Sequence, residues 1–102
     1  MPFIIETFDK PGHQAVRQAH RPAHLRFLDT HKHLLLACGA KLADDGSDLG
    51  GGLYVVELDT REAAQSFIES DPFFTAGLFE RVSITRWRKA YVAGASHLPA
   101  AA

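Results

Sequence analysis

Two short segments of the chain carry side chains that could transfer a proton. Residues 21–25 (RPAHL) lie in the first third of the sequence, and residues 71–73 (DPF) lie in the last third. An imidazole changes charge near neutral pH, so His24 is a candidate general acid or base. A carboxylate that accepts a hydrogen bond from an imidazole fixes its tautomer and stabilises its charged form. If the fold brings the segments together, His24 and Asp71 form a catalytic pair.

Each member of this pair also has a structural interpretation. Spacing alone favours a helix histidine whose ring binds a backbone carbonyl. Asp71 precedes Pro72 and is typical of a helix N-cap, where the carboxylate accepts hydrogen bonds from free backbone N–H groups. The two roles of Asp71 are compatible, because one oxygen can cap the helix while the other accepts a hydrogen bond from the imidazole.

Arg21, Gly51 and Gly52 are candidate substrate-binding residues. Arg21 precedes His24 by one helical turn, so it could bind an anionic group beside it, or it could simply be solvated. Gly51 and Gly52 could present backbone N–H groups to an oxyanion, although a flexible hairpin loop is the favoured interpretation. No Lys or Ser/Thr follows these glycines at phosphate-loop spacing, which argues against nucleotide binding.

The aromatic residues and the single cysteine have mainly structural interpretations. Phe73 could exclude water from a site, but Phe73, Tyr54 and Trp87 are each more typical of a core or a dimer interface. Cys38 is expected to be a buried small hydrophobic residue, because a nucleophilic thiol needs an adjacent base and a lowered pKa. We therefore do not assign Cys38 to the site.

A cluster of histidines raises the question of a metal centre. His20, His24, His31 and His33 lie close together in the sequence. Pro22 separates the first two, no cysteine lies beside them, and no acidic residue has metal-ligand spacing. We therefore expect no physiological metal site and no cofactor.

The remaining sequence predicts the elements that would position these residues. The predicted order is strand, helix, strand, strand, helix, strand, which is the ferredoxin-like arrangement of an α+β fold. The expected elements are a strand at 2–8, a helix from Pro22 to 30–33, strands at 34–42 and 53–58 around a loop at 44–52, a helix from Thr60, a short helix from Asp71, and a strand at 82–92. A four-stranded antiparallel sheet would carry the helices on one face and leave the other bare, available to a partner.

Length and composition limit the function classes. The chain has 102 residues, net charge −1 and one cysteine. This predicts one domain over 1–92 with a flexible tail at 93–102, and gives no electrostatic basis for nucleic-acid or membrane binding. No signal peptide or membrane span is evident, and a lone cysteine fits a reducing, cytoplasmic setting.

Taken together, residues 21–25 (RPAHL), 71–73 (DPF), 76–80 (AGLFE) and 82–91 resemble the YciI-like family over roughly residues 3–92. The resemblance implies a ferredoxin-like fold of the dimeric α+β barrel superfamily, and hence a homodimer through the open sheet face. It also implies a small enzyme whose His–Asp pair maps onto His24 and Asp71. Many members have a serine where this chain has the glycines before Leu53, so a hydroxyl that could contact ligand is missing.

The function hypothesis is a cofactor-independent enzyme of isomerase or lyase type. His24, oriented by Asp71, would move a proton on a small, anionic or aromatic-derived metabolite, which Arg21 would anchor. The alternative is a non-catalytic metabolite-binding or regulatory dimer that uses the same pocket.

Overall fold

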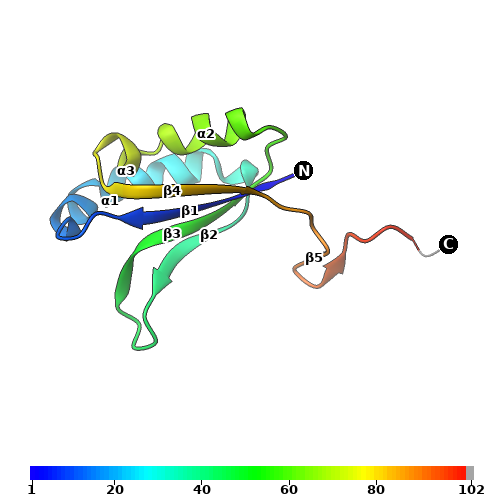
Figure 1. The fold of residues 1–102 in the computed structure, drawn as a ribbon, viewed down its shortest axis with the longest axis horizontal. Coiled ribbons are helices and arrows are strands. Elements are labelled where there is room, and N and C mark those ends of the chain that lie inside the picture. Colours follow the sequence, from blue (N-terminus) through cyan, green and yellow to red (C-terminus); the bar gives the residue numbers. More distant parts are fainter. Residues whose placement is uncertain (101–102) are drawn as a thin grey trace.

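The fold is a four-stranded antiparallel sheet with all three α-helices on one of its faces (Figure 1). This computed structural model describes residues 1–100. Its strands are β1 (Phe3–Asp9), β2 (Leu35–Leu42), β3 (Asp48–Val56) and β4 (Phe79–Arg86), with a separate hairpin of β5 (Tyr91–Val92) and β6 (Ala95–Ser96). Its helices are α1 (Gln14–Thr30), the short 3-10 helix η1 (Lys32–Leu34), α2 (Arg61–Glu69) and α3 (Pro72–Thr75). The sheet order β2-β3-β1-β4 confirms the predicted α+β, ferredoxin-like class.

The core lies between the sheet and the helices. Alternate residues of β1, Phe3 and Ile5, face this layer, and β3 contributes Tyr54 and Val56 beside them. Helix α2 presents an apolar stripe that includes the fully buried Ile68. The hydroxyl of Thr60 caps α2 by accepting a hydrogen bond from the Ala63 N–H at 3.1 Å, as the sequence predicts.

Helix α1 begins at Gln14 rather than at Pro22, so the expected helix start is wrong. Pro22 lies inside the helix and is exposed. A proline in this position lacks one backbone N–H and leaves the carbonyl of Gln18 without its helical partner, and on an exposed face water can satisfy that carbonyl. The consequence for the site is that His24 lies in the interior of a long helix instead of at its first turn.

Strand β3 also begins earlier than expected, because Gly51 and Gly52 belong to the strand and not to the preceding loop. Gly51 has a φ of 148°, and a Cβ at this position would overlap the backbone oxygen of Thr7 on β1. Only glycine fits there, since the sheet backbones approach too closely for a side chain. The prediction of a loop over 44–52 is therefore wrong for its second half.

Strand β4 ends at Arg86, although the sequence suggests a strand as far as residue 92. Arg86 pairs with Phe3, the first residue of β1, so β1 offers almost nothing further for β4 to pair with. Trp87 donates its backbone N–H to the carbonyl of Pro2 at 2.9 Å, and the chain then leaves the sheet (Figure 1). The expected tail at 93–102 contains β6, and residues 101–102 of it lie outside the described residues.

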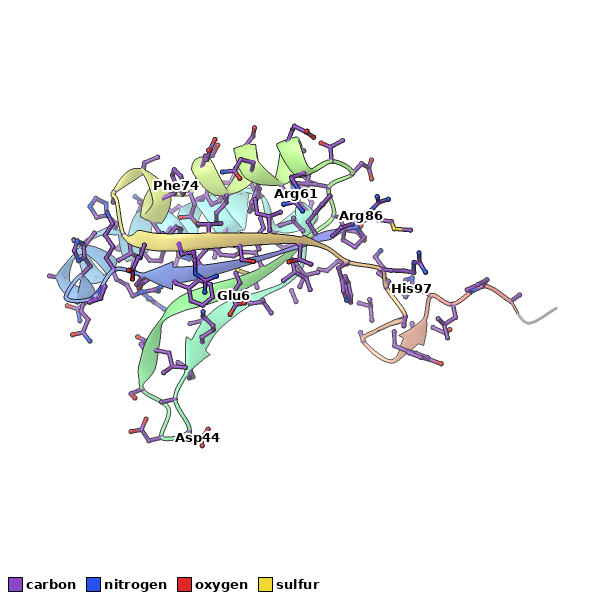
Figure 2. All side chains as sticks on the ribbon, in the orientation of Figure 1. Glu6, Asp44, Arg61, Phe74, Arg86 and His97 are labelled. Atoms are coloured by element: carbon purple, nitrogen blue, oxygen red, sulfur yellow. The ribbon has the colours of Figure 1, made fainter. Side chains whose placement is uncertain are left out.

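The face of the sheet turned away from the helices carries both apolar and charged side chains. Glu6 lies on this face (Figure 2). The ring of Phe8 lies beneath two cations, with Lys41 Nζ 3.6 Å and Arg81 Cζ 3.8 Å from its centroid. Leu53 on β3 is 39% exposed. Within residues 1–100, no helix is both long and apolar enough to cross a membrane.

Candidate active site

The structure brings His24 and Asp71 together from opposite ends of the sequence. His24 projects from α1, and Asp71 lies at the junction of α2 and α3. The Nδ1–H of His24 donates to the Asp71 carboxylate, with both oxygens at 2.9 Å. Asp71 is fully buried, so this bond is shielded from competing water.

Asp71 also performs its capping role. Its Oδ1 accepts a hydrogen bond from the backbone N–H of Phe73 at 2.9 Å, and Pro72 occupies the first position of α3. Asp71 therefore accepts hydrogen bonds from the start of α3 and from His24 at the same time. Because the carboxylate is fixed by the helix that it caps, it offers His24 a rigid acceptor.

A third donor to Asp71 is Tyr54, which the sequence analysis assigned only to the core or to a dimer interface. Its hydroxyl donates to Oδ2 of Asp71 at 2.8 Å. Burial, reinforced by the charge of Asp71 and by this hydrogen bond, raises the pKa of Tyr54 well above its ordinary value, so the phenol stays neutral. Strand alternation with the buried Val56 and the need of a buried hydroxyl for a partner are the signals that could have placed Tyr54 here.

The bond to Asp71 leaves the other ring nitrogen of His24 free to act. Because Nδ1 carries the hydrogen, Nε2 keeps its lone pair, and no side chain or backbone group within residues 1–100 binds it. The imidazole ring stacks on Phe73 with centroids 3.9 Å apart. His24 is thus oriented on two sides and can accept a proton at Nε2.

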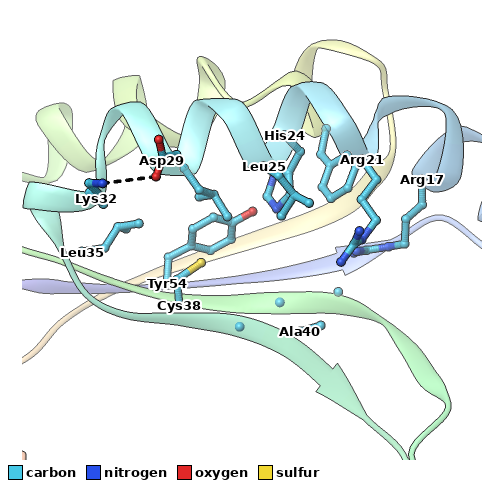
Figure 3. Close-up of a pocket in the computed structure, with 15 residues that line it drawn as sticks. Arg17, Arg21, His24, Leu25, Asp29, Lys32, Leu35, Cys38, Ala40 and Tyr54 are labelled. Carbon is cyan, nitrogen blue, oxygen red and sulfur yellow. Dashed lines mark hydrogen bonds and ion pairs between the residues drawn. The ribbon is translucent and has the colours of Figure 1, made fainter.

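His24 faces a cavity of about 440 Å³ between α1 and the strands β2 and β3 (Figure 3). Leucine side chains of α1 and β2 form its apolar walls, and small residues of β2 and β3 form its floor. The walls are Leu25, Leu28 and Leu35, and the floor is Cys38, Gly39, Ala40, Gly51 and Gly52. A floor without large side chains suits a flat ligand.

The charged groups of the cavity are mostly cationic. Arg17 is held by Asp9, with Nε 2.7 Å from its carboxylate, and its guanidinium lies over Phe73. Lys32 pairs with Asp29 at 3.3 Å at the opposite end of the cavity (Figure 3). Arg21 has no such ion pair within residues 1–100. Within the described residues, Arg21 is therefore the cavity cation most available to an anionic ligand, and Arg17 is a further cavity cation that the sequence analysis did not name.

The two glycines line the cavity, but one of the expected donors is already used. The N–H of Gly52 donates to the hydroxyl of Thr7 at 2.9 Å, inside the sheet. The contribution of Gly52 to ligand binding is thus its missing side chain, which would otherwise fill the floor of the cavity. Gly51 also lines the cavity, but a side chain there would meet the backbone oxygen of Thr7 and not the cavity itself.

Cys38 is exposed, which contradicts its predicted burial. Strand β2 lies at the edge of the sheet, and Cys38 pairs with Tyr54 so that it faces the cavity instead of the core. Partial burial of the sulfur, together with the negative charge of Asp71, raises the pKa of the thiol to about 11. The thiol is therefore protonated near neutral pH and is a poor nucleophile.

The histidine cluster is not gathered around a common point. Within residues 1–100, no three His, Cys, Asp or Glu side chains are arranged to hold a metal ion. The Nδ1 of His31 binds the carbonyl of Phe27 at 2.9 Å, while His20 and His33 are exposed.

Comparison with known proteins identifies the family. The chain matches the YCII-related domain family over residues 1–88. It belongs to this family. Two relatives named protein YciI, from Escherichia coli O6:H1 and Shigella flexneri, are each 33% identical over 98 residues, which is 89% of this chain and 100% of theirs.

A solved structure of similar fold is that of 5-chloro-2-hydroxyhydroquinone dehydrochlorinase (TftG) from Burkholderia phenoliruptrix AC1100, in complex with 2,5-dihydroxybenzoquinone. The two chains share 34% identity, with a TM-score of 0.79 over 86% of this chain and 94% of the dehydrochlorinase. The YCII-related chain therefore shares its architecture with a small-molecule enzyme.

Proposed function

We propose that this YCII-related protein is a cofactor-independent enzyme of lyase or isomerase type that transfers a proton through His24. The observation that carries the proposal is the 2.9 Å hydrogen bond from His24 Nδ1 to Asp71, which leaves Nε2 facing a cavity. Nε2 would take a proton from an acidic O–H or C–H group of the ligand, and Asp71 would stabilise the resulting imidazolium.

The proton has a balanced route in this scheme. The electron pair left on the ligand either expels a leaving anion, with the proton remaining on His24 until it is released to water, or is reprotonated by His24 at another atom. The first course is a lyase reaction and the second an isomerase reaction. Neither course requires an oxidant or a reductant.

The proposed substrate is a small, flat, anionic molecule of hydroxylated aromatic type. The dehydrochlorinase with 34% identity acts on a chlorinated hydroxyhydroquinone, which supports this class. The leucine walls and the glycine floor of the cavity fit a ring, and Arg21 would bind an ionised oxygen on it. Phe73 would hold the imidazole and keep water from its covered face.

The proposed assembly is a homodimer through the open face of the sheet. Exposed Leu53 and the half-buried Phe8 on this face would become covered. The free thiol of Cys38 fits a reducing, cytoplasmic setting.

Ligand binding and turnover, measured separately, test this proposal. The probe is 2,5-dihydroxybenzoquinone for calorimetry and 5-chloro-2-hydroxyhydroquinone for chloride release. The wild type should bind the first and release chloride from the second. His24→Ala and Asp71→Asn should abolish release while retaining binding within a few-fold, and His33→Ala, on the exposed η1, should behave as wild type.

The alternative function is a metabolite-binding module without chemistry. Arg21 and the apolar walls would serve such a module equally well, because they require no proton transfer. Binding of 2,5-dihydroxybenzoquinone without chloride release by the wild type would favour it, especially if His24→Ala and Asp71→Asn only weaken binding.

A further inference from the structure

Tyr54 makes a contact at the site that the proposed proton route does not use. Its side chain comes from β3, is 3% exposed, and donates to Oδ2 of Asp71 at 2.8 Å. The phenol and the His24 imidazole meet edge to face with centroids 6.4 Å apart, so they are not hydrogen-bonded to each other. The hydrogen-bonded link between Tyr54 and His24 therefore runs through Asp71.

The three donors are distributed evenly on the Asp71 carboxylate. Oδ1 accepts from the Phe73 N–H and Oδ2 accepts from the Tyr54 hydroxyl, while His24 Nδ1 lies 2.9 Å from both oxygens. One additional donor on each oxygen keeps the negative charge shared between them. The two donors also fix the orientation of the carboxylate, so that Nδ1 of His24 lies at the same distance from both of its oxygens.

We propose that Tyr54 is a positioning residue that sets the proton affinity of His24 through Asp71. By donating to Oδ2, the phenol withdraws part of the charge that would otherwise stabilise the imidazolium. The catalytic meaning of this role rests on the proposed function, but the effect on His24 does not require turnover.

Other ionisable groups near His24 do not provide the same link. Arg17 and Arg21 on α1 are cations, Arg17 being paired with Asp9, and Cys38 on β2 is a neutral thiol. Asp29 and Lys32, five and eight residues beyond His24, pair with each other. The groups that face His24 from each neighbouring element are Arg17, Arg21, Asp29 and Lys32 near α1, Cys38 on β2, Tyr54 on β3, and Asp71 before α3.

The test is an NMR titration of the His24 ring protons in the wild type and in Tyr54→Phe, which removes only the hydroxyl. The titration midpoint of His24 should rise by about half a pH unit or more, because Asp71 loses a donor and attracts the imidazolium more strongly. Thr7→Val is the matched control. It also removes a buried hydroxyl with a 2.9 Å hydrogen bond, but that hydroxyl does not touch Asp71.

A double variant tests whether the effect of Tyr54 on His24 depends on Asp71. In Asp71→Asn, adding Tyr54→Phe should move the His24 midpoint no further. Equal midpoints in the wild type and Tyr54→Phe would overturn the proposal and leave Tyr54 a packing residue. If Tyr54→Phe does not fold, the carbon-13 shift of Tyr54 Cζ in the wild type replaces it: it should change as His24 titrates, and a constant shift would overturn the proposal.

Measuring chloride release distinguishes a failure of this proposal from a failure of the proposed function. If chloride release occurs, the acidic limb of its pH profile should move upward in Tyr54→Phe by the same amount as the His24 midpoint. If no release occurs but the midpoint still rises, the link from Tyr54 to His24 stands and the enzymatic function fails.

Discussion

The imidazole of His24 lies flat against the ring of Phe73, with centroids 3.9 Å apart and planes inclined by 13°. Phe73 is also the residue whose backbone N–H binds Asp71. One residue therefore supports both members of the pair: its ring fixes the plane of the imidazole, and its amide fixes the carboxylate. The start of α3 thus acts as a template on which the pair is assembled.

Replacing the Phe73 ring should affect His24 more than the fold. Phe73→Leu removes the stacking surface but keeps the backbone N–H and an apolar side chain, so we expect about 1–2 kcal/mol lower unfolding free energy. If the proposed function holds, Phe73→Leu should lower chloride release by more than its loss of stability accounts for. Phe74→Leu, next to it and without contact to the imidazole, is the control; equal activity of the two variants would contradict the template role.

Substitutions can distinguish the stability that comes from the charge of Asp71 from the stability that comes from its capping oxygen. Asp71→Asn keeps an oxygen for the Phe73 N–H, whereas Asp71→Ala leaves three buried donors without an acceptor. We expect Asp71→Ala to lower the unfolding free energy by about 3–5 kcal/mol and Asp71→Asn by clearly less. Chemical denaturation measures both values, and equal losses would show that the charge carries the stabilisation.

Arg21 should determine affinity for anionic ligands. Arg21→Gln should weaken binding of 2,5-dihydroxybenzoquinone roughly tenfold, because a charge-assisted hydrogen bond is lost. The affinity of the wild type should fall with added salt, and that of the variant should depend on salt less. Arg26→Gln, on the same helix but not lining the cavity, is the calorimetric control.

The thiol of Cys38 should react slowly despite its exposure. With a pKa of about 11 it is almost entirely protonated at pH 8. Alkylation by iodoacetamide should therefore be on the order of a hundredfold slower than that of an ordinary cysteine. The rate should keep rising up to about pH 11, and a plateau near pH 9 would contradict the assignment.

Asp71→Asn should accelerate this alkylation. Burial is the larger cause of the raised pKa of Cys38, but the negative charge of Asp71 adds to it. Removing that charge lowers the pKa and increases the thiolate fraction at a fixed pH. His33→Ala, which leaves Asp71 intact, should react as the wild type does.

Two glycines of the cavity floor offer a matched pair for stability. A Cβ on Gly51 would overlap the Thr7 carbonyl oxygen, and the positive φ adds strain, while a Cβ on Gly39 would meet nothing within 4 Å. Gly51→Ala should therefore lower the unfolding free energy by about 2 kcal/mol or more, and Gly39→Ala by less than about 1 kcal/mol. Thermal unfolding followed by circular dichroism measures both.

The sequence was sufficient for the order of the elements because each has a local signal. The Asp71-Pro72 cap and the aromatic and β-branched run of Tyr54, Val55 and Val56 are examples. The limits of α1 and β4 depend on tertiary structure instead. Helix α1 continues through Pro22, where the local pattern predicts a helix start, and β4 stops where its neighbour β1 begins.

The pair of His24 and Asp71 was predicted from the residue types together with the resemblance to the YciI-like family, but its surroundings were not predicted. Tyr54 and Cys38 face the site because β2 and β3 pair in one particular register, with Cys38 opposite Tyr54. A shift of the edge strand β2 by one residue would turn Cys38 to the other face, while the pairing of β3 with β1 keeps Tyr54 in place. The sequence contains the residues but not the pairing that points them toward Asp71.

Helix α1 contributes more large side chains to the cavity than any other element, among them those at positions 17, 21, 24, 25 and 28. The floor is mostly backbone. Side chains on one face of this helix would therefore determine most of the contacts that select a ligand, while the sheet and the start of α3 hold that face in position. Substitutions on that face could give related proteins new ligands without disturbing the fold, so ligand choice in such a protein can evolve independently of stability.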